Sequence, residues 1–359
     1  MLMNSCGNGG NVSQQAASLS SDSPDVTVAV VSDLHFDMPP ETDQYYLVKA
    51  VNRLGDSIHI DAVLQTGDIF DKAAPEIQAL YKLRWEQGDG DRTIHYPTYP
   101  LYGNHDVSPA NGRPNINKKG YELNMQYLDS LLQHRQVARD ICGYDAESRA
   151  YSFNKGGVHF VMVTLAAGDT TYCKSNIEWL KADLETYCAD GTPVVYCQHY
   201  GFDEWALDWW TPEQREQLFG VLRPYRLAAF LVGHTHQWSV QQYAGVPVVQ
   251  VNNAWADGDG PISFCLLKIK GDDVTIETYN VLDEEGHIRR VALQLNQTVN
   301  KQIALSAEDL FEIETQCHHL RACLTHGIGV AQHFFVAQFV SMAGVEGVGE
   351  AVHKLQFRA

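Results

Sequence analysis

Short runs of apolar, mostly β-branched residues recur along most of the chain, and polar residues follow where each run stops. The first run, over residues 26–32, is continuous rather than alternating, which predicts a strand buried on both faces. Similar runs predict strands over 61–66, 97–102, 193–198 and 227–232. Strands buried on both faces belong to the inside of a layered domain.

Stretches with a helical period lie between these runs. Leu47, Val51 and Leu54 fall at i, i+4 and i+7 before Gly55, which predicts a helix that ends at this glycine. Helices are also expected over 75–85 and near 121–133.

Two later helices are predicted from the signals at their starts. Ser175 with Glu178, and Thr211 with Gln214, have the spacing of a capping box, in which each member satisfies a backbone amide of the other. Helices should therefore begin directly after Ser175 and after Thr211.

Strands then follow one another without helices. Residues 151–165 predict a hairpin that turns at 155–157, and strands are expected over 246–251, 262–270 and 274–281. Helices and strands alternate first and strands dominate later. This order predicts an α/β protein in which two sheets pack together with helices outside.

Both ends of the chain differ from this region. Residues 1–25 are rich in Ser, Gly, Asn and Gln, which predicts a disordered tail or tether. Cys6 resembles the lipid-bearing cysteine of a bacterial lipoprotein, but no apolar segment precedes it. A soluble, cytoplasmic protein is the default expectation, and a tethered extracytoplasmic lipoprotein is the alternative.

A catalytic domain is therefore expected over 26–300, followed by a mostly helical extension over 301–359. Residues 327–345 carry no formal charge and approach membrane-spanning length. Polar residues interrupt this stretch, so a buried or docked helix is expected rather than a transmembrane segment.

Composition narrows the class of ligand. The 359 residues carry a formal net charge of -18, which argues against a broad groove for long nucleic acids. A site for phosphate in such a chain needs local positive charge, and bound metal ions can supply it. The eight cysteines are too scattered to indicate a disulfide framework.

Metal-binding side chains follow five of the predicted strands. In α/β sheets, ligands bind beyond the carboxyl ends of the strands, so these side chains are expected at one edge. They are Asp33 and His35, Asp68, Asn104 and His105, His199, and His234 and His236. Five such strand ends in one chain indicate a metal site.

Taken in order, these blocks resemble the calcineurin-like metallophosphoesterase superfamily. Its pattern is D-x-H, G-D-x-x-D, G-N-H-D, a lone His and G-H-x-H, and every block is present here: 33–35, 67–71, 103–106, His199 and 233–236. One departure is local, since Tyr200 and Gly201 follow the lone histidine where many relatives have a proline or a second histidine. The resemblance implies a four-layer αββα sandwich of two packed mixed sheets, and a phosphoester hydrolase.

The resemblance also implies a two-metal centre with seven ligands. Asp33, His35 and His236 would bind the first metal, and Asn104, His199 and His234 the second, with Asp68 bridging both. Two ions that lie close together need such a shared anion. Nitrogen and oxygen ligands suit Mn, Fe or Zn better than Ca or Mg.

In the family, the residue at the position of His105 faces the substrate. A metal-activated hydroxide would attack phosphorus in line while His105 assists the leaving group, and Asp106 would either orient His105 or brace its loop. A small phosphomonoester is the expected substrate. The alternatives are a phosphodiesterase acting on cyclic nucleotides or lipid head groups, and a catalytically silent scaffold on the same fold. The oligomeric state stays open.

Candidate substrate contacts carry less specific signals. Arg113, Lys118 and Lys119 follow the His105 loop, where they either bind extra phosphate groups or form a solvated loop. The aromatic stretch after His199 forms either a wall for the leaving group or a corner of the core; it contains Phe202, Trp205, Trp209 and Trp210. Asn253 follows a strand near the His236 side and is a further candidate.

Overall fold

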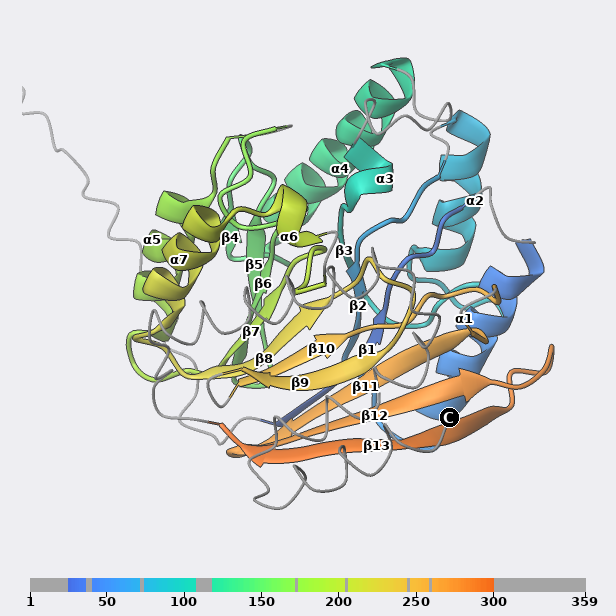
Figure 1. The fold of residues 1–359 in the computed structure, drawn as a ribbon. Helices are drawn as coiled ribbons and strands as arrows, with labels where there is room; N and C mark the ends of the chain where they lie inside the picture. The colour runs from blue at the N-terminus through green and yellow to red at the C-terminus, as the bar shows by residue number, and fades with distance from the viewer. Residues whose placement is uncertain are drawn as a thin grey trace, which may run out of the picture.

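The structure, a computed structural model, describes residues 25–36, 41–71, 74–107, 118–171, 174–203, 206–243, 246–257 and 260–299 (Figure 1). The expected C-terminal extension and all of the expected N-terminal tail except Asp25, which begins a strand, lie outside these ranges and stay predictions. Within the described part of the chain, no helix has the length and apolar character needed to cross a membrane.

A six-stranded mixed sheet contains the first predicted strands, in the order β13-β12-β11-β1-β2-β3. Its strands are β1 (Asp25–Val31), β2 (Ala62–Thr66), β3 (Thr98–Leu101), β11 (Ser263–Lys270), β12 (Asp273–Val281) and β13 (Ile288–Thr298). β1 pairs in parallel with β2, with Val30 opposite Leu64, and antiparallel with β11 on its other side. β2 and β3 are also parallel, so the carboxyl ends of β1, β2 and β3 lie at one edge.

A seven-stranded mixed sheet has the order β4-β5-β6-β7-β8-β10-β9. Its strands are β4 (Gly143–Tyr144), β5 (Tyr151–Lys155), β6 (Val158–Met162), β7 (Val194–Cys197), β8 (Leu227–Val232), β9 (Ser239–Tyr243) and β10 (Val246–Gln250). β6, β7, β8 and β10 are parallel to one another. Their carboxyl ends form a second edge of the same kind.

Helices cover the outer faces of the two sheets (Figure 1). The longer helices are α1 (Glu41–Gly55), α2 (Pro75–Trp85), α4 (Lys118–Ala138), α5 (Ile177–Cys188) and α7 (Pro212–Leu222). Two four-residue helices, α3 (Asn104–Val107) and α6 (Ala206–Trp209), lie instead beyond the ends of strands. In Figure 1, α1 and α2 lie beside the six-stranded sheet and α5 and α7 beside the seven-stranded sheet. The predicted sandwich of two mixed sheets between helices is confirmed.

Aromatic side chains link the inner faces of the two sheets. Tyr99 of β3 stacks on Phe153 of β5 with ring centroids 3.7 Å apart, and Phe153 stacks on Phe160 of β6. The hydroxyl of Tyr151 donates to the carbonyl of Pro100 across the same interface at 2.8 Å. Burying each ring of this size stabilises the fold by about 1.5–3 kcal/mol.

The capping-box spacing predicts one helix start correctly and another wrongly. Thr211 and Gln214 form the predicted capping box of α7. The box predicted for α5 is wrong, because its N-cap is Asn176, whose side chain makes no cap hydrogen bond, and the Ser175 hydroxyl only accepts from Ile177 at 3.5 Å. The Asn176 amide oxygen instead accepts from the backbone of Gly168 at 3.1 Å, a tertiary contact that overrides the local pattern.

The strands β4, β9 and β13 have no counterpart among the predicted elements. Each is the last strand at one end of its sheet, so it has a neighbour on one side only. Edge strands expose one side of the backbone and tolerate polar residues, which weakens the apolar pattern that reveals central strands. The pairing of β13 with β12 also shifts register between Glu277 and Thr278, which interrupts its alternation.

Candidate metal centre

The two edges made by the parallel strands meet at one place. Ser32, directly after β1, forms a parallel bridge with Asn253, which follows β10 of the other sheet. The carbonyl of Asp33 accepts from the amide of Ala254 at 3.5 Å. Side chains from both sheets can therefore converge there, as the sequence predicts.

Most of the expected ligands have a left-handed backbone. Eight non-glycine residues of the described ranges have a positive φ, and five of them are expected ligands: Asp33, His35, Asp68, His234 and His236. Such a conformation costs roughly 1–3 kcal/mol per residue and persists only where the surroundings impose it. It turns the side chain out of the alternation of the preceding strand and toward the shared edge.

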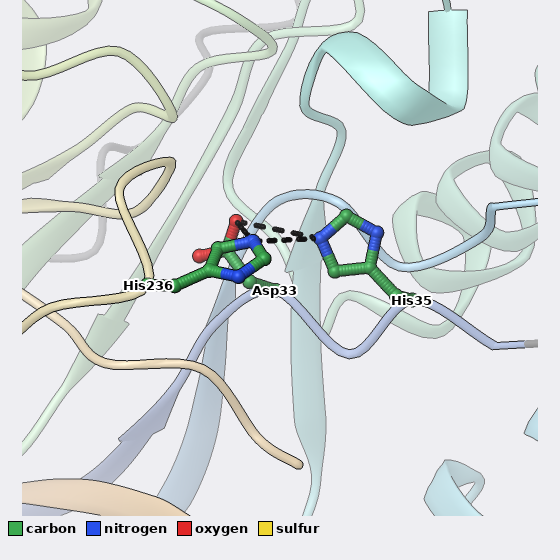
Figure 2. Close-up of side chains that lie close together, drawn as sticks. All are labelled: Asp33, His35 and His236. Atoms are coloured by element: carbon green, nitrogen blue, oxygen red, sulfur yellow. Dashed lines mark hydrogen bonds and ion pairs between the residues drawn. The ribbon is translucent and has the colours of Figure 1, made fainter. Parts of the chain in front are cut away.

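Asp33, His35 and His236 form the first cluster (Figure 2). The Nε2 atoms of the two histidines face each other at 3.0 Å. A neutral imidazole can donate through only one of its two nitrogens, so these two Nε2 atoms need not both carry a hydrogen. Asp33 Oδ1 lies 3.9 Å from His35 Nε2 and 3.7 Å from His236 Nε2. Three ligand atoms thus surround one point.

A carboxylate from a later loop orients the His236 ring. Asp257 Oδ2 lies 3.1 Å from His236 Nδ1 and accepts a second hydrogen bond from Asn253 Nδ2 at 2.7 Å. A hydrogen-bond acceptor at one ring nitrogen keeps the hydrogen on that nitrogen, so the other nitrogen retains a lone pair that can bind a metal. Asn253 itself is fully buried. Its amide supports Asp257, and its expected contact with substrate stays a prediction.

Asp68, His199 and His234 form the second cluster. His199 Nε2 lies 3.3 Å from Asp68 Oδ2 and 3.0 Å from the amide oxygen of Asn104. The Nδ1 of His199 lies 2.8 Å from the carbonyl of Thr66, which fixes the ring as Asp257 does in the first cluster. Asp68 Oδ2 also lies 3.9 Å from His35 Nε2, so this carboxylate lies between the two clusters.

Burial and charge act on these groups in opposite directions. Burial alone would raise the pKa of Asp68, but the neighbouring His199 and His105 hold it well below its usual range. Burial would lower the pKa of His199, yet Asp68 raises it to about 9. Burial, with the charge of His199, lowers the pKa of His234 to about 3, so His234 stays neutral and keeps a lone pair.

Glycines precede Asp68 and His234 because the chains pass too close for a side chain. Gly67 has φ +103°, and a Cβ there would lie 2.4 Å from His199 Nδ1. A Cβ on Gly233 would lie 2.1 Å from the hydroxyl of Ser32 and 2.8 Å from Asp33 Oδ2. Both motifs therefore require glycine at these positions, because side chains at the site lie against the Cα atoms of Gly67 and Gly233.

His105 lies beside the clusters, and Asp71 orients it. His105 Nδ1 is 2.7 Å from Asp71 Oδ1, and its Nε2 is 3.9 Å from Asp68 Oδ2. His105 contacts the ring of His35 edge-on, with centroids 4.5 Å apart, and its side chain is 13% exposed. Asp71 belongs to the G-D-x-x-D block, but no role was predicted for it from the sequence.

Asp106 braces the loops rather than touching a ligand. Its fully buried carboxylate accepts from the backbone amides of Ile69, Phe70 and Gly103 at 2.8 to 3.1 Å. These bonds join the loop after β2 to the loop after β3, which carry Asp68 and Asn104. Of the two roles expected for Asp106, bracing matches this geometry, and Asp71 is the carboxylate that lies against His105.

The remaining substrate candidates separate into three groups. Phe202 is buried among Trp210, Phe219 and Phe230, which matches the core corner that was the alternative to a wall for the leaving group. Arg113 and Trp205 lie outside the described residues. Lys118 and Lys119 begin α4, and the positions of their side chains are not described; these four contacts stay predictions.

The donor set fits a pair of metal ions. Within each cluster the ligand atoms lie within 4.8 Å of one another. His234 Nε2 is buried and has no hydrogen-bond partner in the described part of the chain. Imidazole, carboxylate and amide donors around one shared carboxylate are suited to a dinuclear centre of divalent ions.

Comparisons with known proteins agree with this geometry. The family described as calcineurin-like phosphoesterase matches residues 26–238. Among solved structures, a dimetal phosphatase from Danio rerio is 13% identical with a TM-score of 0.52, covering 77% of this chain and 100% of its own. A purple acid phosphatase from yellow lupin (Lupinus luteus) seeds is 14% identical with a TM-score of 0.53, covering 80% of this chain and 56% of its own.

A third structure carries a different description. GAP50, the anchor in the inner membrane complex of Plasmodium, is 11% identical with a TM-score of 0.51, covering 81% of this chain and 94% of its own. At such identities these likenesses show the fold alone. No curated protein matches the sequence.

Proposed function

The chain belongs to the calcineurin-like phosphoesterase family and is a metal-dependent phosphoester hydrolase, and we propose that it is a phosphatase acting on small phosphomonoesters. The observation that carries the proposal is the position of His105 beside the shared carboxylate Asp68, with its Nδ1 held by Asp71. A proton donor at this place serves a leaving alkoxide, the demanding part of monoester hydrolysis.

The proposed ligands follow from the two clusters. Asp33, His35 and His236 would hold one ion, Asn104, His199 and His234 would hold the other, and Asp68 would be shared between them. When bound, the ions supply positive charge for the phosphoryl oxygens and lower the pKa of a bound water, and the nitrogen and oxygen donors favour Mn, Fe or Zn. This positive charge provides the local positive potential that a phosphate site requires in a chain of net charge -18.

His105 holds the proton that the leaving group requires. Asp71 lies against its Nδ1, which stabilises the imidazolium and leaves the Nε2 hydrogen directed away from Asp71. Burial would raise the pKa of Asp71, but His105 and His35 keep it far below its usual range, so Asp71 stays an anion. Donation from Nε2 to the ester oxygen then leaves a neutral imidazole that solvent reprotonates.

Two alternatives are compatible with the same site or fold. A phosphodiesterase would use the same ligands and differ only in accepting a second ester group. A binding scaffold is consistent with the fold, since the Plasmodium protein with this fold is described as an anchor. The complete donor set disfavours the scaffold, because seven convergent ligands and an oriented His105 have no purpose in a purely binding surface.

Parallel assays distinguish these functions. The full chain, stripped of metal and reloaded separately with Mn, Fe or Zn, is assayed with nitrophenyl phosphate and with bis(nitrophenyl) phosphate. We expect two bound ions per chain by elemental analysis, activity that returns with metal, and a higher kcat/KM for the monoester. Preference for the diester would make the protein a phosphodiesterase, and two bound ions without turnover of either ester would make it a scaffold.

A further inference from the structure

A tryptophan with an exposed face lies beside the second cluster. Trp209, the last residue of α6, is 47% exposed. Its ring centroid lies 5.6 Å from that of His234 and 5.6 Å from that of Tyr200. Four large apolar side chains are exposed in the described ranges, and Trp209 is the only aromatic one among them. Exposing aromatic surface to water is unfavourable in free energy, so a ligand that covers this surface beside the site gains binding free energy.

The neighbouring residue explains why Trp209 stays at the surface. Trp210 is fully buried, and its indole nitrogen donates to the carbonyl of Ala167 at 3.1 Å. Asp203 closes the start of α6 by accepting from the amide of Ala206 at 2.9 Å. This short helix is thus anchored at both ends, and the Trp209 ring is held in place rather than free to turn into the core.

The inner side of the Trp209 ring is packed and its outer side is open. Tyr200 and His234 contact one another with centroids 5.1 Å apart, and both contact Trp209. His234 is a proposed metal ligand, so an organic group that extends from a phosphate bound at the centre can reach Trp209. Rings stack on an immobilised indole at little entropic cost.

The opposite side of the centre has a tryptophan of different character. Trp255 lies 6.2 Å from the ring centroids of both His35 and His236 and is only partly exposed. Its indole nitrogen is buried and has no hydrogen-bond partner within the described residues. Trp255 therefore covers the first cluster, whereas Trp209 presents an open face.

We propose that Trp209 is a specificity-determining platform that stacks an aromatic or heteroaromatic ring in the leaving group of the substrate. This inference rests on the proposed phosphatase function and narrows its substrates to phosphoesters that carry such a ring. The acidic chain favours a neutral or cationic ring over one with further negative charge.

Two probes with the same kind of leaving oxygen test the platform. Benzyl phosphate and cyclohexylmethyl phosphate both release a primary alkoxide and differ in whether the ring is aromatic. For the metal-loaded wild type we expect a higher kcat/KM for benzyl phosphate. Trp209→Leu, which keeps an apolar side chain, should reduce this preference about three- to tenfold, mainly through KM, and Trp209→Phe should retain most of it.

Control variants locate the effect. Leu282→Ala removes an exposed apolar side chain of another region, and we expect its preference to equal that of the wild type. Trp255→Leu tests the opposite side of the centre. The platform is refuted if the wild type has no aromatic preference, if Trp209→Leu keeps it, or if Trp255→Leu alone removes it. Failure of the proposed function looks different, because the metal-loaded wild type would then hydrolyse neither probe.

Discussion

The two halves of the proposed metal centre orient their histidines by different means. In the half that contains His199, the imidazole is fully buried and its Nδ1 faces the backbone carbonyl of Thr66. In the half that contains His236, the imidazole is 22% exposed and its Nδ1 faces the carboxylate of Asp257. One orienting group therefore belongs to the backbone of β2, and the other to a side chain in a loop.

This difference predicts unequal responses to mutation. No side-chain substitution removes the Thr66 carbonyl, so the His199 half depends on the fold itself. The His236 half depends on one carboxylate that a single substitution can delete. Orienting partners of metal ligands typically change metal affinity by about 10–100-fold. We therefore expect the His236 half to be the more adjustable and more exchangeable part of the centre.

The largest expected effect comes from Asp68, which belongs to both halves. Asp68→Asn replaces the shared anion with a neutral amide, so two cations lose the charge that lets them lie close together. We expect activity to fall by several orders of magnitude while circular dichroism and thermal unfolding show a folded protein. Elemental analysis should find fewer than two ions per chain. Near wild-type turnover at saturating metal would show that Asp68 does not bridge.

The comparison also explains which parts of the site the sequence predicts. Asp33, Asp68 and His234 come two residues after the ends of apolar strands, so their convergence follows from the rule for strand ends. The Thr66 carbonyl has no residue signature at all, and Asp257 lies 21 positions after His236 in a loop without a motif. Partners that arise from tertiary packing leave no periodic or local signal.

Similar reasons separate the correct and incorrect fold predictions. The central strands were predicted because burial on both faces produces continuous apolar runs, whereas the edge strands β9 and β13 were not. Phe202 and Asn253 were expected at the substrate because they follow strands near ligands. Position after a strand does not determine side-chain direction: Phe202 points into the core, and Asn253 toward Asp257.

The second-largest expected effect comes from His105, and it distinguishes a loss of the chemical step from a loss of bound metal. His105→Ala removes the proposed proton donor but keeps the backbone amide that donates to Asp68 Oδ1 at 2.8 Å. We expect both ions to remain and turnover to fall about 10²–10⁴-fold. The loss should be larger for an alkyl phosphate than for nitrophenyl phosphate, whose leaving group needs little protonation.

Asp71→Asn is the companion variant, since an amide oxygen still accepts from His105 but carries no charge to stabilise the imidazolium. Its loss should lie between those of the wild type and His105→Ala, with the same dependence on the leaving group. An equal loss for both substrates would make His105 an electrostatic residue. Loss of an ion in His105→Ala would instead make it a metal ligand.

The smallest effect concerns the His236 half alone. Asp257→Ala removes the acceptor at His236 Nδ1, so the ring loses its fixed orientation while Asp33 and His35 stay in place. We expect affinity for one of the two ions to fall about 10–100-fold, measured by competition with a chelator, and the second ion to stay bound. Asp257→Asn, which keeps an acceptor oxygen, should lose less. Asp89→Ala, at an exposed acidic position outside the site, controls for the loss of one negative charge. Equal weakening of both ions would contradict the independence of the two halves, because the Thr66 carbonyl would then not suffice to hold His199 in its binding orientation.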